Sequence, residues 1–368
     1  MMLGVEIAAA VSLVVHCGPA TPAGSAVPDI SPDGLEVAYT IPREESAEIE
    51  VARPGTVSPR TRWLTLDSAP EKLVWSARGR VLAFQKRTGA IEVLSFGRPS
   101  ISRELVHVEH GTTTELGDWA PDGRQLVFAR DGHIHTLDVA TGDIRYLTDG
   151  LHPTWAPDGL VIAYAAGKEL REIRPDRGPP RTIASADFPV AAIAWSPDST
   201  RLAFLGGVLG IVTRFGGRPA YTVAAEPPLA WRPNGIFYSF EVALADGSVR
   251  RFDPETRKTM QLTHLPPGHD ASFVAVSHDG TRVLYRLEVR DLPAGVRVVD
   301  GNGRQDRPVL ACHGTNKPDV VRGSRLNDVI RVNGGGPDRV TCGAGSDVVY
   351  ADRRDRVAQD CERVTRLP

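Results

Sequence analysis

The sequence lacks both an excess of basic residues and a long hydrophobic run. Its 368 residues include 43 Lys and Arg against 45 Asp and Glu, for a formal net charge of −2. A chain without a basic excess has little with which to neutralise phosphates, so we expect no nucleic-acid partner. The apolar run at 7–15 is too short to cross a bilayer, so we expect no transmembrane span in the mature chain.

The first 26 residues have most features of an export signal. The short apolar run precedes small residues at 23–26 that suit cleavage, although Glu6 stands where a signal usually carries Lys or Arg. We therefore predict a signal peptide over 1–26 and a protein located outside the cell, on its surface or in the periplasm. Cys17 weakly resembles a bacterial lipoprotein site, which leaves a lipid anchor open as an alternative to a cysteine that is discarded with the signal.

A short pattern recurs along most of the chain. In the copy at Trp195, the residues Ser-Pro-Asp have type I turn chemistry, and Leu202 and Phe204 then alternate as in a strand. Seven copies follow one another about 40 residues apart, and five of the six Trp lie in them. The copies begin at Ile30, Trp75, Trp119, Trp155, Trp195, Trp231 and Val276.

A period near 40 with four strands per repeat is typical of propeller blades. The Trp-Ser-Pro-Asp core, with a Thr-Gly turn and a Leu-Thr tail in the copy at Trp119, resembles the TolB-like (WD40-like) propeller repeat over residues 27–310. The resemblance implies an all-β fold with seven blades, or six if the first copy is incomplete. The alternative is an ordinary β-sandwich with accidental turns. We expect the ring to close with a strand from 307–310, because the first inner strand is short.

Composition changes after residue 310, where Gly, Asp and Arg replace apolar alternation. Four nine-residue repeats, aligned on Asp, resemble the haemolysin-type RTX calcium repeat. The resemblance implies a small β-roll over 311–368 that binds Ca²⁺ through turn carbonyls and aspartates. Its ligands would be Asp319 facing Asp338, and Asp328 facing Asp347. Several Gly positions of the family are replaced here, so a roll that binds little metal and a disordered polar tail remain alternatives.

Three of the four cysteines lie in this C-terminal segment. An exported protein is expected to oxidise a pair, and we favour Cys342–Cys361 because a small roll with little core needs a covalent link. Cys312 would then be left free or paired between chains.

Nothing in the sequence forms a convergent catalytic set. His133 and His135 share a strand face but lack an evident third ligand, and the recurring Asp residues are explained by turn formation. Peptidases with such propellers carry a hydrolase domain, but no G-x-S-x-G motif occurs and 311–368 is too short for that domain.

We therefore predict a monomeric, non-enzymatic binding or scaffold protein whose partner is a protein, peptide or glycan, with Ca²⁺ as its cofactor. Two alternatives are a propeller hydrolase or lyase acting on a peptide or glycan at the channel mouth, and a TolB-like partner protein of the cell envelope. A cluster of charged residues from several blades around the axis would favour the enzyme.

Overall fold

A computed structural model describes most of the chain, and all its regular elements are strands. The described residues are 13–16, 28–42, 46–53, 61–96, 100–109, 111–176, 178–240, 248–263, 269–289, 292–300, 306–308, 312–313, 318–323, 325–332 and 336–366. The chain divides into two compact units. The propeller unit comprises residues 21–54 and 58–309, and the C-terminal unit comprises 1–20, 55–57 and 310–368.

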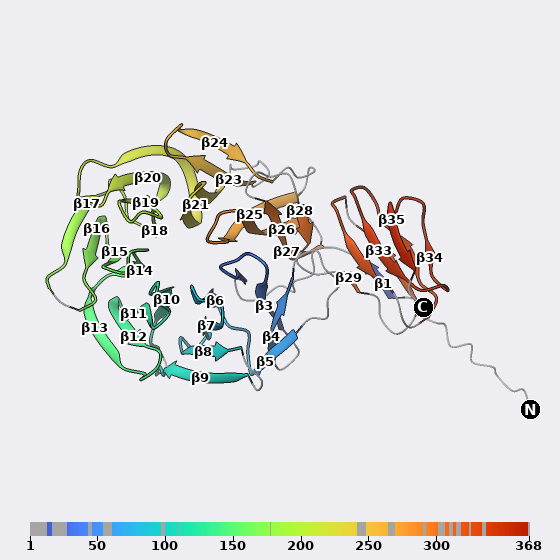
Figure 1. The fold of residues 1–368 in the computed structure, drawn as a ribbon, viewed down its shortest axis with the longest axis horizontal. Helices are drawn as coiled ribbons and strands as arrows, with labels where there is room; N and C mark the ends of the chain where they lie inside the picture. Colours follow the sequence, from blue (N-terminus) through green and yellow to red (C-terminus); the bar gives the residue numbers. More distant parts are fainter. Residues whose placement is uncertain are drawn as a thin grey trace, which may run out of the picture. The chain divides into compact units, whose positions relative to one another are not determined.

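The propeller unit consists of antiparallel sheets whose strands follow one another in sequence order (Figure 1). The first sheet contains β2 (Asp29–Ile30), β3 (Val37–Pro42), β4 (Ala47–Ala52) and β5 (Thr61–Leu66). The second contains β6 (Lys72–Trp75), β7 (Val81–Gln85), β8 (Ile91–Ser95) and β9 (Ile101–Val106). The third contains β10 (Thr114–Trp119), β11 (Gln125–Arg130), β12 (His133–Asp138) and β13 (Ile144–Asp149). The fourth contains β14 (Leu151–Trp155), β15 (Ile162–Ala166), β16 (Glu169–Ile173) and β17 (Arg181–Ser185).

The next two four-stranded groups share one long strand. They contain β18 (Ala192–Trp195), β19 (Arg201–Leu205), β20 (Gly207–Thr213), β21 (Ala220–Arg232), β22 (Gly235–Phe240), β23 (Ser248–Asp253) and β24 (Lys258–Gln261). β21 pairs with β20 through its first half and with β22 through its second half. The last sheet contains β25 (His269–Val276), β26 (Arg282–Val289), β27 (Leu292–Asp300) and β28 (Asp306–Pro308).

The recurring Ser-Pro-Asp turns join the first and second strands, as their sequence predicts. In the first copy the Gly34 N–H donates to the Ser31 carbonyl at 2.8 Å, and the Ser31 hydroxyl donates to Asp33 at 2.6 Å. Gly34 has a φ of 70°, which a glycine adopts without strain. The aspartates of these turns therefore act in turn formation.

The cores of the propeller unit lie between neighbouring sheets. Trp195 packs with Ala163 and Leu170 of the fourth sheet, and Trp75 packs with Ile49 of the first. The indole N–H of Trp195 donates to the Thr154 carbonyl at 3.3 Å, so the same side chain also bonds the neighbouring first strand. Burial of each indole between sheets thus couples adjacent repeats.

The first strands of successive sheets form a closed circuit. β2 contacts β6, and the contacts continue through β10, β14, β18, β21 and β25 back to β2. At the closure, the His278 N–H donates to the Pro32 carbonyl at 3.1 Å. Residues 307 and 308 belong to β28, which pairs with β27 of the last sheet, so the expected exchange into the first sheet is wrong for them. Residues 309 and 310 lie outside the described residues. The all-β propeller fold is confirmed; the number of blades stays a prediction, because β21 belongs to two groups.

The C-terminal unit contains two parallel sheets, to which successive segments contribute alternately. One contains β1 (Leu13–His16), β30 (Asp319–Arg322), β32 (Arg339–Thr341) and β34 (Arg356–Val357). The other contains β29 (Cys312–His313), β31 (Val329–Arg331), β33 (Val348–Ala351) and β35 (Arg363–Arg366). Buried Val321, Ile330, Val340 and Val349 belong to its core.

Parts of the N-terminal prediction can be located. Of the predicted signal peptide only Leu13–His16 is described, as β1 alongside β30, and Cys17 lies outside the described residues. Within the described part of the chain, no helix has the length and apolar character needed to cross a membrane.

Candidate functional site

Four charged or titratable residues from different sheets interact at the axis of the ring. They are Asp29, Asp118, Arg232 and His278, and we call them the axis cluster. Arg232 has an electrostatic interaction with both Asp118 and Asp29. His278 has one with Arg232 and Asp118. All four lie in or directly after the first strands, each of which contacts the first strands of the neighbouring sheets.

Asp29 is held by backbone donors from two sheets. Its Oδ2 accepts the N–H of Trp75 at 2.8 Å, and its Oδ1 accepts the N–H of Ile30 at 2.9 Å. Burial raises the pKa of Asp29 to about 7, against the lowering effect of these donors and of Arg232. The carboxyl therefore changes its charge near neutral pH, as an acid or base at a reactive site must.

The other members are oriented by neighbouring strands. Arg232 donates from Nε to the Ser277 carbonyl at 3.2 Å, and burial lowers its pKa. Burial also lowers the pKa of His278, and the positive charge of Arg232 lowers it further. Asp118 accepts the hydroxyl of Thr154 at 2.6 Å. The cluster thus combines both signs of charge, and the pKa values of Asp29, Arg232 and His278 are shifted.

A second polar pair joins β10 and β14. Glu115 Oε1 lies 2.7 Å from Nδ1 of His152, and Glu115 Oε2 accepts the backbone N–H of His152 at 3.1 Å. Both strands are irregular here, with register shifts between Leu116 and Trp119 and between Leu151 and Thr154. The pair therefore depends on two β-bulges, features that often redirect side chains beside active sites.

We missed the axis cluster in the sequence, although a signal for it was present. Arg232 occupies a position that is Ser or Ala in the other copies, and His278 occupies a position that is Pro or Ala. Asp29 and Asp118 stand directly before the first residue of their copies, a position at which the other copies have Val, Thr or Ala. Departures from the repeat, rather than its recurring aspartates, mark the site.

The predicted metal ligands of the C-terminal unit stack in two ladders. Asp338 Oδ1 accepts the N–H of Asp319 at 2.8 Å, and Asp347 Oδ1 accepts the N–H of Asp328 at 2.7 Å. The first ladder continues to Asp355, which accepts the N–H of Asp338 at 3.0 Å. The structure thus places Asp319 beside Asp338 and Asp328 beside Asp347.

Two carboxylates of these ladders are fully buried. Asp338 and Asp347 are both 0% exposed, and Oδ2 of each has no hydrogen-bond partner in the described part of the chain. Burial raises the pKa of each to about 6, and neighbouring carboxylates add to the effect. A buried oxygen without a donor is a group that a cation would satisfy, so the donor chemistry fits Ca²⁺.

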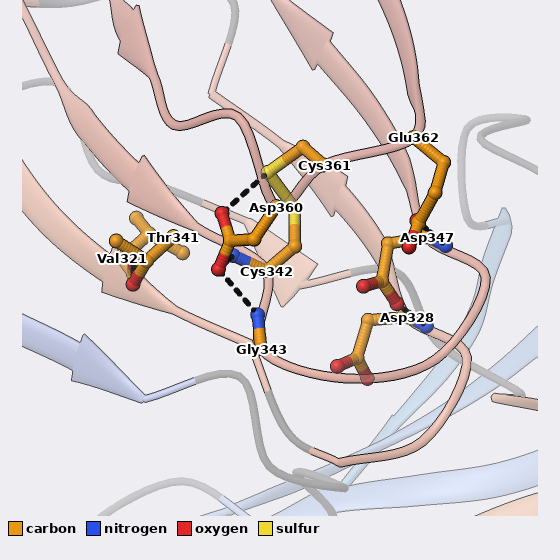
Figure 2. The surroundings of a disulfide bond; sticks show 9 residues. All are labelled: Val321, Asp328, Thr341, Cys342, Gly343, Asp347, Asp360, Cys361 and Glu362. Carbon is orange, nitrogen blue, oxygen red and sulfur yellow. Dashed lines mark hydrogen bonds between the residues drawn. A yellow bond between two sulfur atoms is a disulfide. The ribbon is translucent and has the colours of Figure 1, made fainter.

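A disulfide closes the last turn of this unit, as predicted. Cys342 and Cys361 are bonded at 2.00 Å, and Asp360 Oδ2 accepts the N–H groups of Cys342 and Gly343 at 3.1 and 2.9 Å (Figure 2). Figure 2 also shows Asp347 between Asp328 and Glu362. Of Cys312 only the backbone is described.

The paired histidines of the third sheet do not gather a third ligand. His133 Nδ1 lies 2.6 Å from Asp149 Oδ1, and His135 is buried with Nδ1 on the His133 carbonyl at 2.9 Å. Among the described residues, the one group of three potential metal donors within 4.8 Å is Cys342, Asp360 and Cys361. The disulfide occupies two of these three, so this group is not a metal centre.

Comparison with known proteins finds peptidases. No protein-family model matches the chain. The curated Tricorn protease homolog 1 of Streptomyces coelicolor is 26% identical over 386 aligned residues, which cover 75% of this chain and 35% of that protein. A solved structure, a puromycin-hydrolyzing peptidase of Mycobacterium tuberculosis, is similar with a TM-score of 0.62 at 18% identity. The alignment covers 81% of this chain and 56% of the chain of that peptidase, and this similarity supports the fold alone.

These relatives correct the predicted function. Because the curated relative is a protease, the prediction of a non-enzymatic binding or scaffold protein is wrong, and the alternative of a propeller hydrolase is better supported. The missing G-x-S-x-G motif excludes only one kind of hydrolase domain. The chain spans about a third to about half of the length of the proteins it matches.

Proposed function

We propose that the propeller unit belongs to a hydrolase that acts on peptides. The observation that carries this proposal is the axis cluster, in which Asp29, Asp118, Arg232 and His278 converge from different sheets. A purely structural ring does not require charged or titratable residues at positions that are uncharged in its other repeats. The similarity to two peptidases favours a peptide as substrate.

The cluster suits a peptide because it offers charges of both signs. Arg232 is a donor for carbonyl or carboxylate oxygens, and Asp118 is an acceptor for N–H groups or an ammonium. Asp29, with a pKa near 7, can take up or release a proton there.

The test is peptide hydrolysis by the full chain, followed by mass spectrometry on a peptide mixture. Arg232→Ser and His278→Ala introduce residues that other copies carry at these positions, so the turns should form, and His278→Ala keeps the backbone N–H that donates to Pro32. We expect each to lower kcat/KM at least about 10-fold. Arg201→Ala is the control, since Arg201 covers the Trp231 ring at 5.0 Å and lies outside the cluster. Absence of hydrolysis by the unchanged protein would refute the proposal.

We also propose that the C-terminal unit is an RTX-like calcium roll of a secreted or surface-located protein with a TolB-like propeller. The unpartnered Oδ2 atoms of Asp338 and Asp347 support calcium. Calorimetric titration of the full chain should show saturable Ca²⁺ binding that Asp338→Ala and Asp347→Ala abolish. No heat and no change in melting with calcium would mean a roll that only keeps the shape.

A further inference from the structure

We infer that His152 is a general base of this hydrolase, oriented by Glu115 through the contact between Glu115 Oε1 and His152 Nδ1. This inference rests on the proposed peptide hydrolysis and assigns a chemical step to a pair outside the axis cluster. Glu115 is a positioning residue, and His152 is the group that meets the reacting water.

The hydrogen bonds of the pair fix which ring nitrogen is free. Burial raises the pKa of Glu115, but the hydrogen bond and charge of His152 outweigh burial, and the net pKa lies below its usual value. Glu115 is therefore ionised at neutral pH and can only accept, so Nδ1 of His152 carries the proton. In the neutral form of the ring, Nε2 then holds the lone pair, as required of a base. In the imidazolium form, whose charge lowers the pKa of Glu115, both nitrogens carry a proton and the ring cannot act as a base.

The backbone at His152 is held in an unfavourable conformation. His152 has a φ of 54°, in the left-handed region that non-glycine residues rarely adopt. β10 packs closely on β14 next to this residue: a Cβ added to Gly117 would lie 2.6 Å from the Pro153 carbonyl oxygen. Residues strained in this way occur more often at functional sites.

The side chains of the pair are partly exposed to solvent and partly buried. The side chains of His152 and Glu115 are 31% and 35% exposed, so water reaches the ring. Other charged or titratable groups lie on the strands that contact β14. One more, Lys72, lies on β6. They are Lys72, which interacts with Glu115, and Asp118, Arg130, His133, His135, Asp138 and Tyr164. β18, on the other side of β14, has no titratable side chain.

The step is a base-assisted attack by water on the peptide carbonyl. Nε2 takes a proton from water as the water oxygen bonds to the carbonyl carbon, and the carbonyl π electrons move to its oxygen. When the tetrahedral intermediate collapses, the C–N bond breaks and the imidazolium returns the proton to the leaving nitrogen. The products are an amine and a carboxylic acid, and Glu115 stays ionised throughout.

The experiment measures the pH dependence of kcat/KM for peptide hydrolysis by the full chain. We expect activity to fall on the acid side in the unchanged protein, as the base becomes protonated. His152→Gln should lose about 10²–10⁴-fold in kcat/KM and the acid limb with it. Glu115→Gln should lose less, because its amide oxygen still accepts from Nδ1–H.

His133→Gln is the matched control, since His133 makes the same kind of carboxylate contact to Asp149 at 2.6 Å, on the third strand of the same sheet as Glu115. It should keep both rate and profile. Retained activity in a folded His152→Gln, or a flat profile of the unchanged protein between about pH 5 and 8, would overturn the base assignment while hydrolysis itself stands. The flat-profile result needs no variant, so misfolding cannot mask it. An unchanged protein that cleaves no peptide would instead overturn the proposed function, and the base with it.

Discussion

In the propeller unit a buried tryptophan packs between neighbouring sheets, whereas in the C-terminal unit a buried aspartate lies between neighbouring coils. Trp195 contacts apolar side chains of the fourth sheet and bonds Thr154 with its indole. Asp338 accepts one backbone N–H and leaves Oδ2 without a partner. The C-terminal strands, two to four residues long, bury only a small apolar core around Val321 and Ile330, so this unit depends more on carboxylates and a disulfide.

The largest expected effect tests the apolar half of this comparison. Trp195→Ala should lower the free energy of unfolding of the propeller by about 3–5 kcal/mol, since it leaves a cavity between two sheets. All six Trp belong to the propeller unit, so the remaining indoles report its unfolding by fluorescence. A loss below about 1 kcal/mol would show that the tryptophans do not carry the contacts between sheets.

Next in size is the covalent link of the C-terminal unit. Replacing both Cys342 and Cys361 by Ser should destabilise this unit by about 3 kcal/mol, because the bond closes a loop with a sequence separation of 19. Hydrogen exchange in residues 336–366 measures the effect. Tryptophan fluorescence should show an unchanged propeller; a joint loss would show that the units unfold together.

A smaller expected effect is the pH dependence that Asp338 gives to the stability of the C-terminal unit. The pKa of Asp338 is about 6 in the folded chain and 3.8 ordinarily, so this carboxyl binds its proton more tightly when folded. Without calcium, its contribution is complete below about pH 4 and is lost as the pH rises through about 6.

Asp338→Asn should remove part of that loss, on the order of 1–2 kcal/mol, because the amide oxygen still accepts from Asp319 N–H. Hydrogen exchange of the calcium-free protein at about pH 4 and about pH 7.5 checks this. The variant should be compared with the unchanged chain at each pH. An equal pH dependence in both would contradict the role of Asp338.

The smallest effect compares two tryptophans within the propeller. The indole N–H of Trp195 is bonded, whereas that of Trp155 is buried without a partner. Trp195→Phe should therefore cost about 1 kcal/mol more than Trp155→Phe, measured by urea unfolding. Equal costs would show that packing alone stabilises these positions.

The sequence predicts the repeating parts better than the exceptional ones. Residues 31–34 have turn chemistry that needs no distant partner, so their conformation was predictable. The separation of Asp319 and Asp338 likewise anticipated their placement on neighbouring strands, which the pairing of Val320 with Arg339 bears out. Local chemistry and a fixed period are sufficient for both.

The candidate site depends on information that a single repeat does not contain. The bulge before Trp119 arises where Gly117 approaches Pro153 of the next sheet, a contact between strands far apart in sequence. The pairing of Glu115 with His152 follows from that bulge and from a second one in β14. Arg232 and His278 were predictable from the sequence, because each is a charged or titratable residue at a position where the other copies carry an uncharged one.

At the shared strand β21, two neighbouring groups of strands are joined by an uninterrupted strand and not by a loop. Its residues up to Ala225 pair with β20 and those from Glu226 pair with β22, so a single backbone segment serves two neighbouring groups of strands. Elsewhere the chain can be opened in the connection between sheets, for example at 67–71, without cutting a strand. A circularly permuted or split form of this protein should therefore reassemble from a break at 67–71 and fail from a break within Ala220–Arg232.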